Sequence, residues 1–235
     1  MPGLSSGDRR FSADHGSADP VAAAALAAFA AGTGSEQAAL TALARVRLLV
    51  PVVAAPAQDS GGRVAREDAE KATEMSIPTL VGHDGRPAVP AFTSLDAMVR
   101  WRPGARPVPV EAGRVWQSAA ADSCAVVLDI AGPVPVAIDG ARLAALASGQ
   151  PVPMPYEDPD VLAAVTAIVA GQPAVSAALL AAGGDGSDLT VELAIPAGHA
   201  ESASELARSV AAAVMARLGG RLRRGVQIVI SPPRA

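Results

Sequence analysis

The stretch that decides the fold reads IPTLVGHDGRPAVPAFTSLDAMVRWR and runs from Ile77 to Arg102. Two short apolar runs flank a turn at residues 83–86, and Asp-Gly between such runs favours a β-hairpin because glycine adopts positive φ without steric cost. Thr93 is followed three residues later by Asp96, a spacing typical of a capping box, so we expect a helix to begin at Thr93. The segment predicts a strand–turn–strand–helix unit. The predicted buried face of the helix consists of Leu95, Met98 and Val99.

Helical and strand-like patterns precede this unit. Val21–Ala31 is a predicted helix with Asp19 as its N-cap, and Ser35–Arg45 is a second predicted helix. Arg47–Ala54 is strand-like, although Pro51 lacks a ladder donor and therefore indicates an edge or a bulge.

A second hairpin follows the unit, and its alternation of apolar and polar residues is regular. Asp139-Gly140 closes this hairpin, and Arg142–Ser148 is predicted to form a short helix that ends at Gly149. Two matching apolar rows identify the strands, namely Cys124, Val126 and Leu128 on one and Val134, Val136 and Ile138 on the other.

Four prolines between Gln150 and Pro159 mark the best linker of the chain. After them the pattern starts again as helix, strand, strand, helix and strand, with Asp158 as the first N-cap and Ser202 with Glu205 as a second capping pair. The fold class predicted is α+β, with two mixed regions built from β-hairpins and short helices. The expected organisation is a disordered tail at residues 1–18, an N-terminal domain at 19–150 and a smaller C-terminal region at 151–235.

The order of these motifs resembles the N-terminal domain of the SseB family, the enhanced-serine-sensitivity proteins, in its actinobacterial type. The resemblance covers roughly Ala38 to Gly149. It implies an α+β fold, no established enzyme activity and a loosely defined role. The matching residues are, in chain order, Leu48–Val52, Ile77–Leu80, Ala88–Ser94, Trp101, Arg106–Val110, Val126–Asp129, Ala131–Pro133 and Ile138–Gly140.

Composition narrows the possible partners and the cellular compartment. The net charge is −4 and aromatic residues make up 3% of the chain, which argues against a nucleic-acid surface built on basic and stacking side chains. Cys124 is the single cysteine, so the chain has no internal disulfide and fits a reducing compartment. No apolar run reaches the roughly 20 residues of a membrane span. We therefore expect a cytoplasmic protein that binds neither nucleic acid nor membrane.

Residues that can carry chemistry are few and scattered. The three histidines, His15, His83 and His199, show no ligand spacing, so no metal site is predicted. Cys124 is interpreted as a buried, inert thiol on an apolar strand face, with a catalytic nucleophile as the weaker alternative. We predict no catalytic residue and no cofactor.

Two carboxylates and two hydroxyls are further candidate site residues. Asp129 and Asp139 end the strands of the second hairpin, where acid–base work is possible but a turn or cap role is favoured. Thr93 and Ser94 lack the Gly-x-Ser-x-Gly elbow of a serine nucleophile, so capping is the better interpretation. A basic cluster at the end of the last long helix is interpreted as cations at a helix C-terminus, with an acidic or phosphate-bearing partner as the alternative. It contains Arg217, Arg221, Arg223 and Arg224.

The candidate interaction site is at the end of the opening segment. Trp101 closes the predicted short helix, with Phe92 and Arg102 nearby, and a partly exposed tryptophan there is suited to anchor a protein partner, although a core role is the alternative. The sequence thus predicts a non-enzymatic SseB-like protein that acts by protein–protein interaction or as an adaptor. The alternative is a small-ligand binder or enzyme with a pocket between the two regions.

Overall fold

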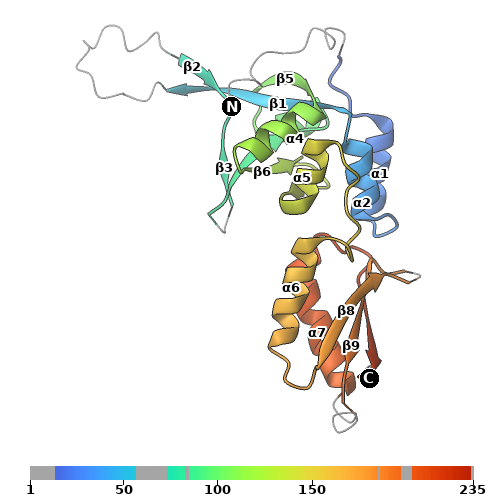
Figure 1. The fold of residues 1–235 in the computed structure, drawn as a ribbon. Coiled ribbons are helices and arrows are strands. Elements are labelled where there is room, and N and C mark those ends of the chain that lie inside the picture. The colour runs from blue at the N-terminus through green and yellow to red at the C-terminus, as the bar shows by residue number, and fades with distance from the viewer. Residues whose placement is uncertain (1–13, 57–72, 83–84, 185, 197–202, 234–235) are drawn as a thin grey trace, which may run out of the picture. The chain divides into compact units, whose positions relative to one another are not determined.

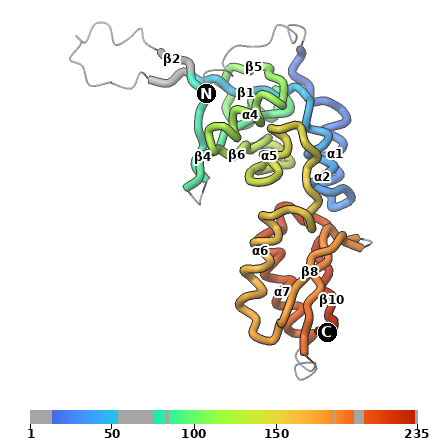
Figure 2. The backbone as a smooth tube through the Cα atoms, in the orientation of Figure 1, coloured from blue at the N-terminus to red at the C-terminus, as the bar shows by residue number. Residues whose placement is uncertain are grey.

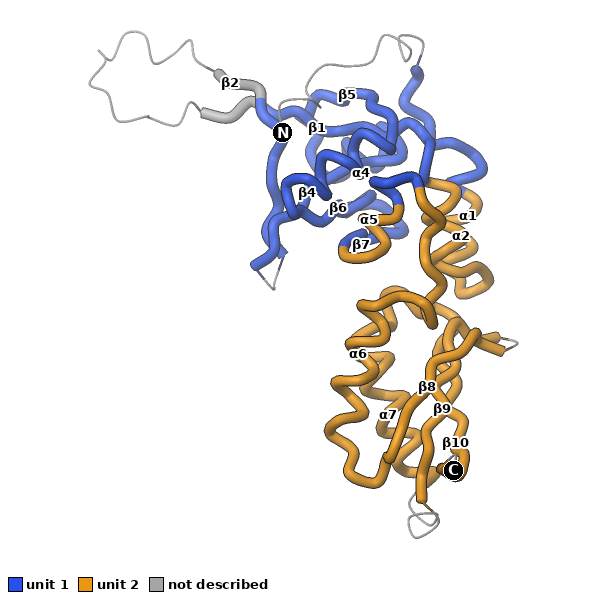
Figure 3. Tube along the Cα trace, in the orientation of Figure 1, with its two compact units in different colours: residues 1–23, 44–139, 146–149 blue, residues 24–43, 140–145, 150–235 orange. Residues whose placement is uncertain are grey.

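The computed structural model describes residues 14–56, 73–82, 85–184, 186–196 and 203–233. The chain divides into two compact units, shown in Figure 3. Unit 1 contains residues 1–23, 44–139 and 146–149, and unit 2 contains residues 24–43, 140–145 and 150–235. Residues 1–13 of the predicted tail, His83 and His199 lie outside the described residues.

Unit 1 contains an antiparallel sheet in the order β2-β1-β5. Leu49 in β1 exchanges backbone hydrogen bonds of 2.8 and 2.9 Å with Phe92, so its N–H is directed away from β5. Pro51, two residues on, therefore needs no donor toward β5, where it lies opposite Pro107. This register accommodates prolines that would otherwise break a ladder. The strands are β1 (Arg47–Pro56), β2 (Thr73–Ser76) and β5 (Arg106–Glu111).

A second sheet in unit 1 has the order β3-β4-β6-β7 and contains both predicted hairpins. In the first hairpin the Gly82 N–H donates to the carbonyl of Arg86 at 2.9 Å, and Gly85 has a φ of +77°. The inner strands β4 and β6 are parallel, because the chain crosses through α3, β5 and α4 between them (Figure 2). The elements are β3 (Leu80–Val81), β4 (Pro87–Ala91), β6 (Ala125–Leu128), β7 (Val136–Ile138), α3 (Leu95–Trp101) and α4 (Ala112–Ala121).

Helix α3 differs from its prediction in its cap and in its buried face. Ser94, not Thr93, is the N-cap, and its hydroxyl accepts from the Ala97 N–H. Met98 is buried as predicted, but Leu95 and Val99 are 36% and 42% exposed. The prediction was wrong because a helix of two turns can bury one narrow stripe, and Ala97 takes the place beside Met98.

Three further helices contribute residues to unit 2. The carboxylate of Asp19 accepts from the N–H groups of Val21 and Ala22, as an N-cap does. The N-cap of the next helix is Ser35, which accepts from the Ala38 N–H. Both predicted helices are present, and Gly149, with a φ of +68°, follows the third. Their bounds are α1 (Pro20–Ala30), α2 (Glu36–Leu43) and α5 (Gly140–Ser148).

The C-terminal part of unit 2 shows the predicted order of helix, strand, strand, helix and strand (Figure 1). Its sheet has the order β10-β9-β8, with β8 antiparallel and β10 parallel to β9. Leu189, Val191 and Leu193 alternate on the buried face of β9 and pack with residues of α6 and α7, so both helices cover that face. None of the described helices is long and apolar enough to cross a membrane. The elements are α6 (Pro159–Ala170), β8 (Ala177–Ala182), β9 (Leu189–Ala194), α7 (Ala203–Leu218) and β10 (Val226–Ser231).

Candidate functional site

The structure brings together the three residues of the predicted interaction site. Phe92 is fully buried and pairs with Leu49 of β1 through the backbone, which fixes its ring in the core. Trp101, at the end of α3, is half-buried, and the ring centroids of Phe92 and Trp101 lie 5.5 Å apart with the planes tilted by 35°. That separation is within the range of favourable aromatic pairs. The buried Phe92 ring therefore supports Trp101 on the side that faces the core.

Arg102 extends this stack to the surface. Its backbone N–H caps α3 by donating to the Met98 carbonyl at 2.9 Å, and its side chain is exposed. The guanidinium carbon Cζ lies 5.5 Å from the centroid of the Trp101 ring, a distance typical of a cation–π contact. A planar cation over an aromatic ring presents both apolar area and hydrogen-bond donors to a partner.

The exposed side of α3 continues this surface. Leu95 and Val99 are four residues apart, so they lie on the same side of the helix. The Leu95 N–H donates to the Gly16 carbonyl at 2.7 Å, and the neighbouring Asp14 carboxylate forms an ion pair with Arg47 at 2.5 Å. Gly16, which belongs to the predicted tail, thus contacts the first residue of α3. We call Leu95, Val99, Trp101 and Arg102 the α3 surface.

Thr93 and Asp129 form a buried pair that follows the carboxyl ends of β4 and β6. Thr93 donates to the Asp129 carboxylate twice, from its N–H at 2.8 Å and from its hydroxyl at 2.6 Å. Asp129 has a φ of +48°, a left-handed conformation that aspartate tolerates better than most residues. Burial raises the pKa of Asp129, and the two bonds from Thr93 oppose this rise. Both carboxylate oxygens are occupied, so the pair joins two parallel strands.

The other predicted chemical residues lie apart from this pair. Asp139 forms an ion pair of 2.7 Å with Arg86 on the neighbouring hairpin. Cys124 precedes β6 and is half-buried rather than buried, because it lies in the turn after α4 and not on the strand. His15 is exposed. In the part of the chain that the structure describes, no group of three or more His, Cys, Asp or Glu residues is placed to hold a metal ion.

Arg221 and Arg224 of the basic cluster form ion pairs within unit 2. Arg221 binds Glu36 at the start of α2, with 3.0 Å between Nε and Oε2, and Asp158 at the N-cap of α6, with 2.5 Å between Nη2 and Oδ2. Burial lowers the pKa of Arg221, but the attraction of Glu36 and Asp158 outweighs it and raises that pKa. Arg142 of α5 forms a second ion pair with Glu36. We call these four residues the buried ion cluster.

Sequence reasoning missed the buried ion cluster. Glu36 is at the first position of a helix and Asp158 is an N-cap. Carboxylates are favoured at both positions by the helix itself, so neither residue indicates an ion pair with a distant arginine. The prediction of helix-terminal cations applies to Arg217, in the last turn of α7. Arg224 instead pairs with buried Asp188 at 2.8 Å, and Arg223 lies over the ring of Phe29 with Cζ 5.7 Å from its centroid.

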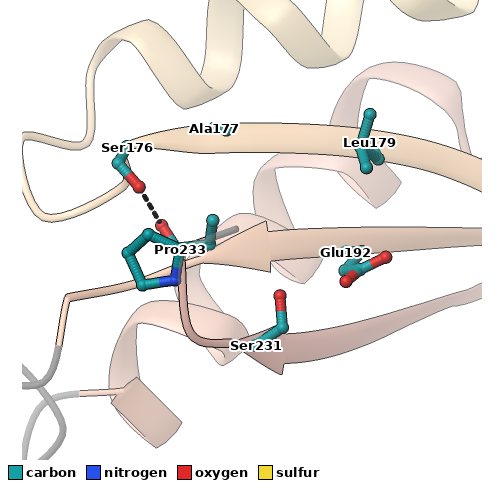
Figure 4. A pocket seen from close by; sticks show the side chains of 7 residues that line it. Ser176, Ala177, Leu179, Glu192, Ser231 and Pro233 are labelled. Carbon is teal, nitrogen blue, oxygen red and sulfur yellow. Dashed lines mark hydrogen bonds between the residues drawn. The ribbon is translucent and has the colours of Figure 1, made fainter. Parts of the chain in front are cut away.

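A shallow hollow of about 340 Å³ lies on the outer face of the unit 2 sheet (Figure 4). Ser176 closes one end of it, where its hydroxyl donates to the Ala194 carbonyl at 3.0 Å. Small and apolar side chains make up most of its wall, and the sheet face there lies opposite the helices. Its lining residues are Ser176, Ala177, Leu179, Glu192, Ala194, Ser231 and Pro233.

Comparison with known proteins identifies the family. The family model described as the SseB protein N-terminal domain matches residues 23–145, which is just over half of the chain. The chain belongs to the SseB family. No curated protein and no solved structure matches it. The predicted SseB family is thereby confirmed, and the SseB match includes the whole α3 surface together with Thr93 and Asp129.

The SseB match also contains residues of both compact units. Glu36 and Arg142 lie inside it but belong to unit 2, where the buried ion cluster joins them to Asp158 and Arg221 beyond the matched span. Residues of the SseB domain are thus held by charges supplied from the C-terminal sequence.

Proposed function

We propose that this SseB-family protein has no enzyme activity and acts by binding another protein through the α3 surface. The observation that carries the proposal is the stack of Phe92, Trp101 and Arg102, in which a fully buried ring supports a half-buried tryptophan beside an exposed arginine. Tryptophan and arginine dominate the binding energy of many interfaces, and a rigid support lowers the entropy lost on binding.

The contacts of Asp129 and Arg221 also support a non-enzymatic role. Asp129 holds Thr93, and Arg221 holds two carboxylates. Each of these side chains serves a contact within the fold. The exposed apolar residues of α3, Leu95 and Val99, add surface that suits a protein partner.

Paired variants test the proposal by affinity capture followed by direct binding measurement. Trp101→Ala and Val99→Glu are both expected to lower the affinity for the partner at least tenfold. Val21→Glu is the control, because Val21 is an equally apolar residue on α1 that is 68% exposed, and it should leave the affinity unchanged. Trp101→Ala should cost about 2 kcal/mol of stability, roughly half the value for a fully buried tryptophan. Val99→Glu should leave the melting temperature nearly unchanged because Val99 is exposed.

Two results would contradict the proposal. The first is a partner bound equally well by wild type, Trp101→Ala and Val99→Glu. The second is a metabolite that stabilises the protein in a thermal-shift panel, since a ligand at a hundred times its dissociation constant adds about 2.7 kcal/mol and points to small-ligand binding.

A further inference from the structure

Strand β8 is at an edge of the unit 2 sheet. The order β10-β9-β8 gives β8 one neighbour, and no other strand of the described residues pairs with its outer side. An edge strand presents unpaired N–H and C=O groups that can template another strand. The outer edge of β8 is therefore a potential pairing site.

The register shows which backbone groups of β8 are on that outer edge. The N–H of Ile195 donates to the carbonyl of Ser231 in β10 at 2.9 Å, so the odd-numbered residues of β9 direct their backbone to β10 and the even-numbered ones to β8. Glu192 pairs with Leu179, so the backbone groups of Leu179 are directed inward to β9. The backbone groups one residue away, on Ala178 and Leu180, are consequently directed to the open edge.

The edge strands β3, β5, β7 and β10 carry features that hinder pairing, and β8 does not. Strand β5 contains Pro107 and Pro109 between charged ends, while β3 and β7 are two and three residues long. Strand β10 is followed directly by Pro232-Pro233. Natural proteins use prolines, charges and short strands to protect edges. Strand β8 reads Ala-Ala-Leu-Leu-Ala-Ala over Ala177–Ala182 and has neither charge nor proline.

We propose that β8 pairs antiparallel with β8 of a second copy of this chain, forming a dimer with a continuous sheet. Every side chain of Ala177–Ala182 is apolar and uncharged, so an antiparallel copy brings only apolar side chains of this strand against one another. A two-fold axis perpendicular to the sheet makes the contact isologous, as in most dimers. The absence of charge on β8 means that two identical edges meet without electrostatic repulsion.

The same geometry selects the register. With the axis perpendicular to the sheet, each residue faces one on the same side of the sheet, so one residue lies opposite its own copy. Leu179 and Leu180 are the two central candidates. Leu180 already packs against the hydrophobic core of unit 2, whereas Leu179 is 49% exposed beside the hollow in Figure 4. Pairing of Leu179 with its copy buries this side chain. It is also a non-hydrogen-bonded pair, in which Cα atoms approach to about 4.5 Å.

Sedimentation equilibrium of the full chain over a hundredfold range of concentration tests the dimer. We expect a monomer–dimer equilibrium that Leu179→Lys weakens at least tenfold, because two ammonium groups then meet at the axis. Val229→Lys is the matched control, since Val229 is on the opposite edge strand β10 and is 38% exposed. Ala182→Pro, which removes an outward-directed donor without adding charge, should weaken the dimer as Leu179→Lys does. Circular dichroism melts establish that each variant is folded.

Disulfide trapping tests the register. In a Cys124→Ser background, Leu179→Cys is expected to form an intermolecular disulfide under mild oxidation, since the expected Cα separation fits disulfide geometry. Val229→Cys in the same background is expected to stay reduced. A protein that is monomeric at every concentration overturns the proposal. So does a dimer that Val229→Lys abolishes and Leu179→Lys does not, or one that neither substitution affects.

Discussion

Replacing Arg221 with methionine removes the charge that compensates two buried carboxylates. The Arg221 side chain is 15% exposed, and those of Glu36 and Asp158 are 7% and 0% exposed. Methionine keeps most of the apolar stem, so the loss is mainly that of the guanidinium and its bonds. Two carboxylates then remain in a site with little access to water.

The expected cost follows from what each carboxylate retains. Removing one partner of a buried ion pair costs about 3–5 kcal/mol. Glu36 keeps its ion pair with Arg142, and Asp158 keeps the Asp160 N–H at 2.8 Å, so we expect about 3 kcal/mol, at the lower end. A domain has roughly 5–15 kcal/mol of stability in total, so this loss is a large fraction.

Urea unfolding followed by circular dichroism, with hydrogen exchange of β9 as a probe of unit 2, measures this cost. A loss of about 3 kcal/mol moves the midpoint by roughly 1–2 M in urea. The control is Arg217→Met, on the exposed end of α7, where the loss of a favourable helix-end charge costs about 0.3–1 kcal/mol. Adding Asp158→Asn to Arg221→Met should restore part of the stability, because asparagine still caps α6 without a charge. Equal effects of Arg221→Met and Arg217→Met would refute this reasoning.

Two further predictions concern Asp129 and Cys124. Because burial raises the pKa of Asp129, the folded protein binds this proton more tightly than the unfolded chain. This proton contributes its whole stabilising free energy below the pKa of about 3.9 that Asp129 has in the unfolded chain. The contribution is lost as the pH rises through the higher pKa that Asp129 has in the folded protein. Asp129→Asn should therefore flatten the pH dependence of the unfolding free energy above about pH 4, and an unchanged pH profile in urea titrations contradicts this. Cys124→Ser should change stability by no more than about 1 kcal/mol, because the thiol is half-buried; a much larger fall in thermal stability means that the thiol is part of the core.

Local sequence patterns were enough to predict most elements of the fold. The Asp-Gly turn, the capping residues Asp19 and Asp158, and the alternation of β9 all act within a few residues, and the structure shows each corresponding element. The same locality made the grouping of Phe92, Trp101 and Arg102 predictable, since ten residues and one short helix connect them. Their role in binding stays a prediction.

Pairings between distant residues could not be predicted in this way. The parallel contact of β4 with β6 depends on a crossover through another sheet, and no periodicity in either strand encodes it. The spacing of Thr93 to Asp96 predicts a cap at Thr93, yet the Thr93 hydroxyl binds Asp129, which is 36 residues away. Ser94 has the same capping chemistry one residue later. Choosing between two adjacent hydroxyls requires knowing which distant carboxylate is near.

The bond between Glu36 and Arg221 spans 185 residues, and this separation has a consequence for folding kinetics. Closing so long a loop costs chain entropy before the contact stabilises anything, so contacts of this kind form after local helices and hairpins. The buried ion cluster is therefore expected to be absent from the transition state of folding. In mutational kinetics its residues should have φ-values, the ratio of the change in folding barrier to the change in stability, near zero. Substitutions in it then accelerate unfolding and leave the folding rate almost unchanged. The buried ion cluster forms late in folding, so it determines how long unit 2 stays folded rather than how quickly it folds.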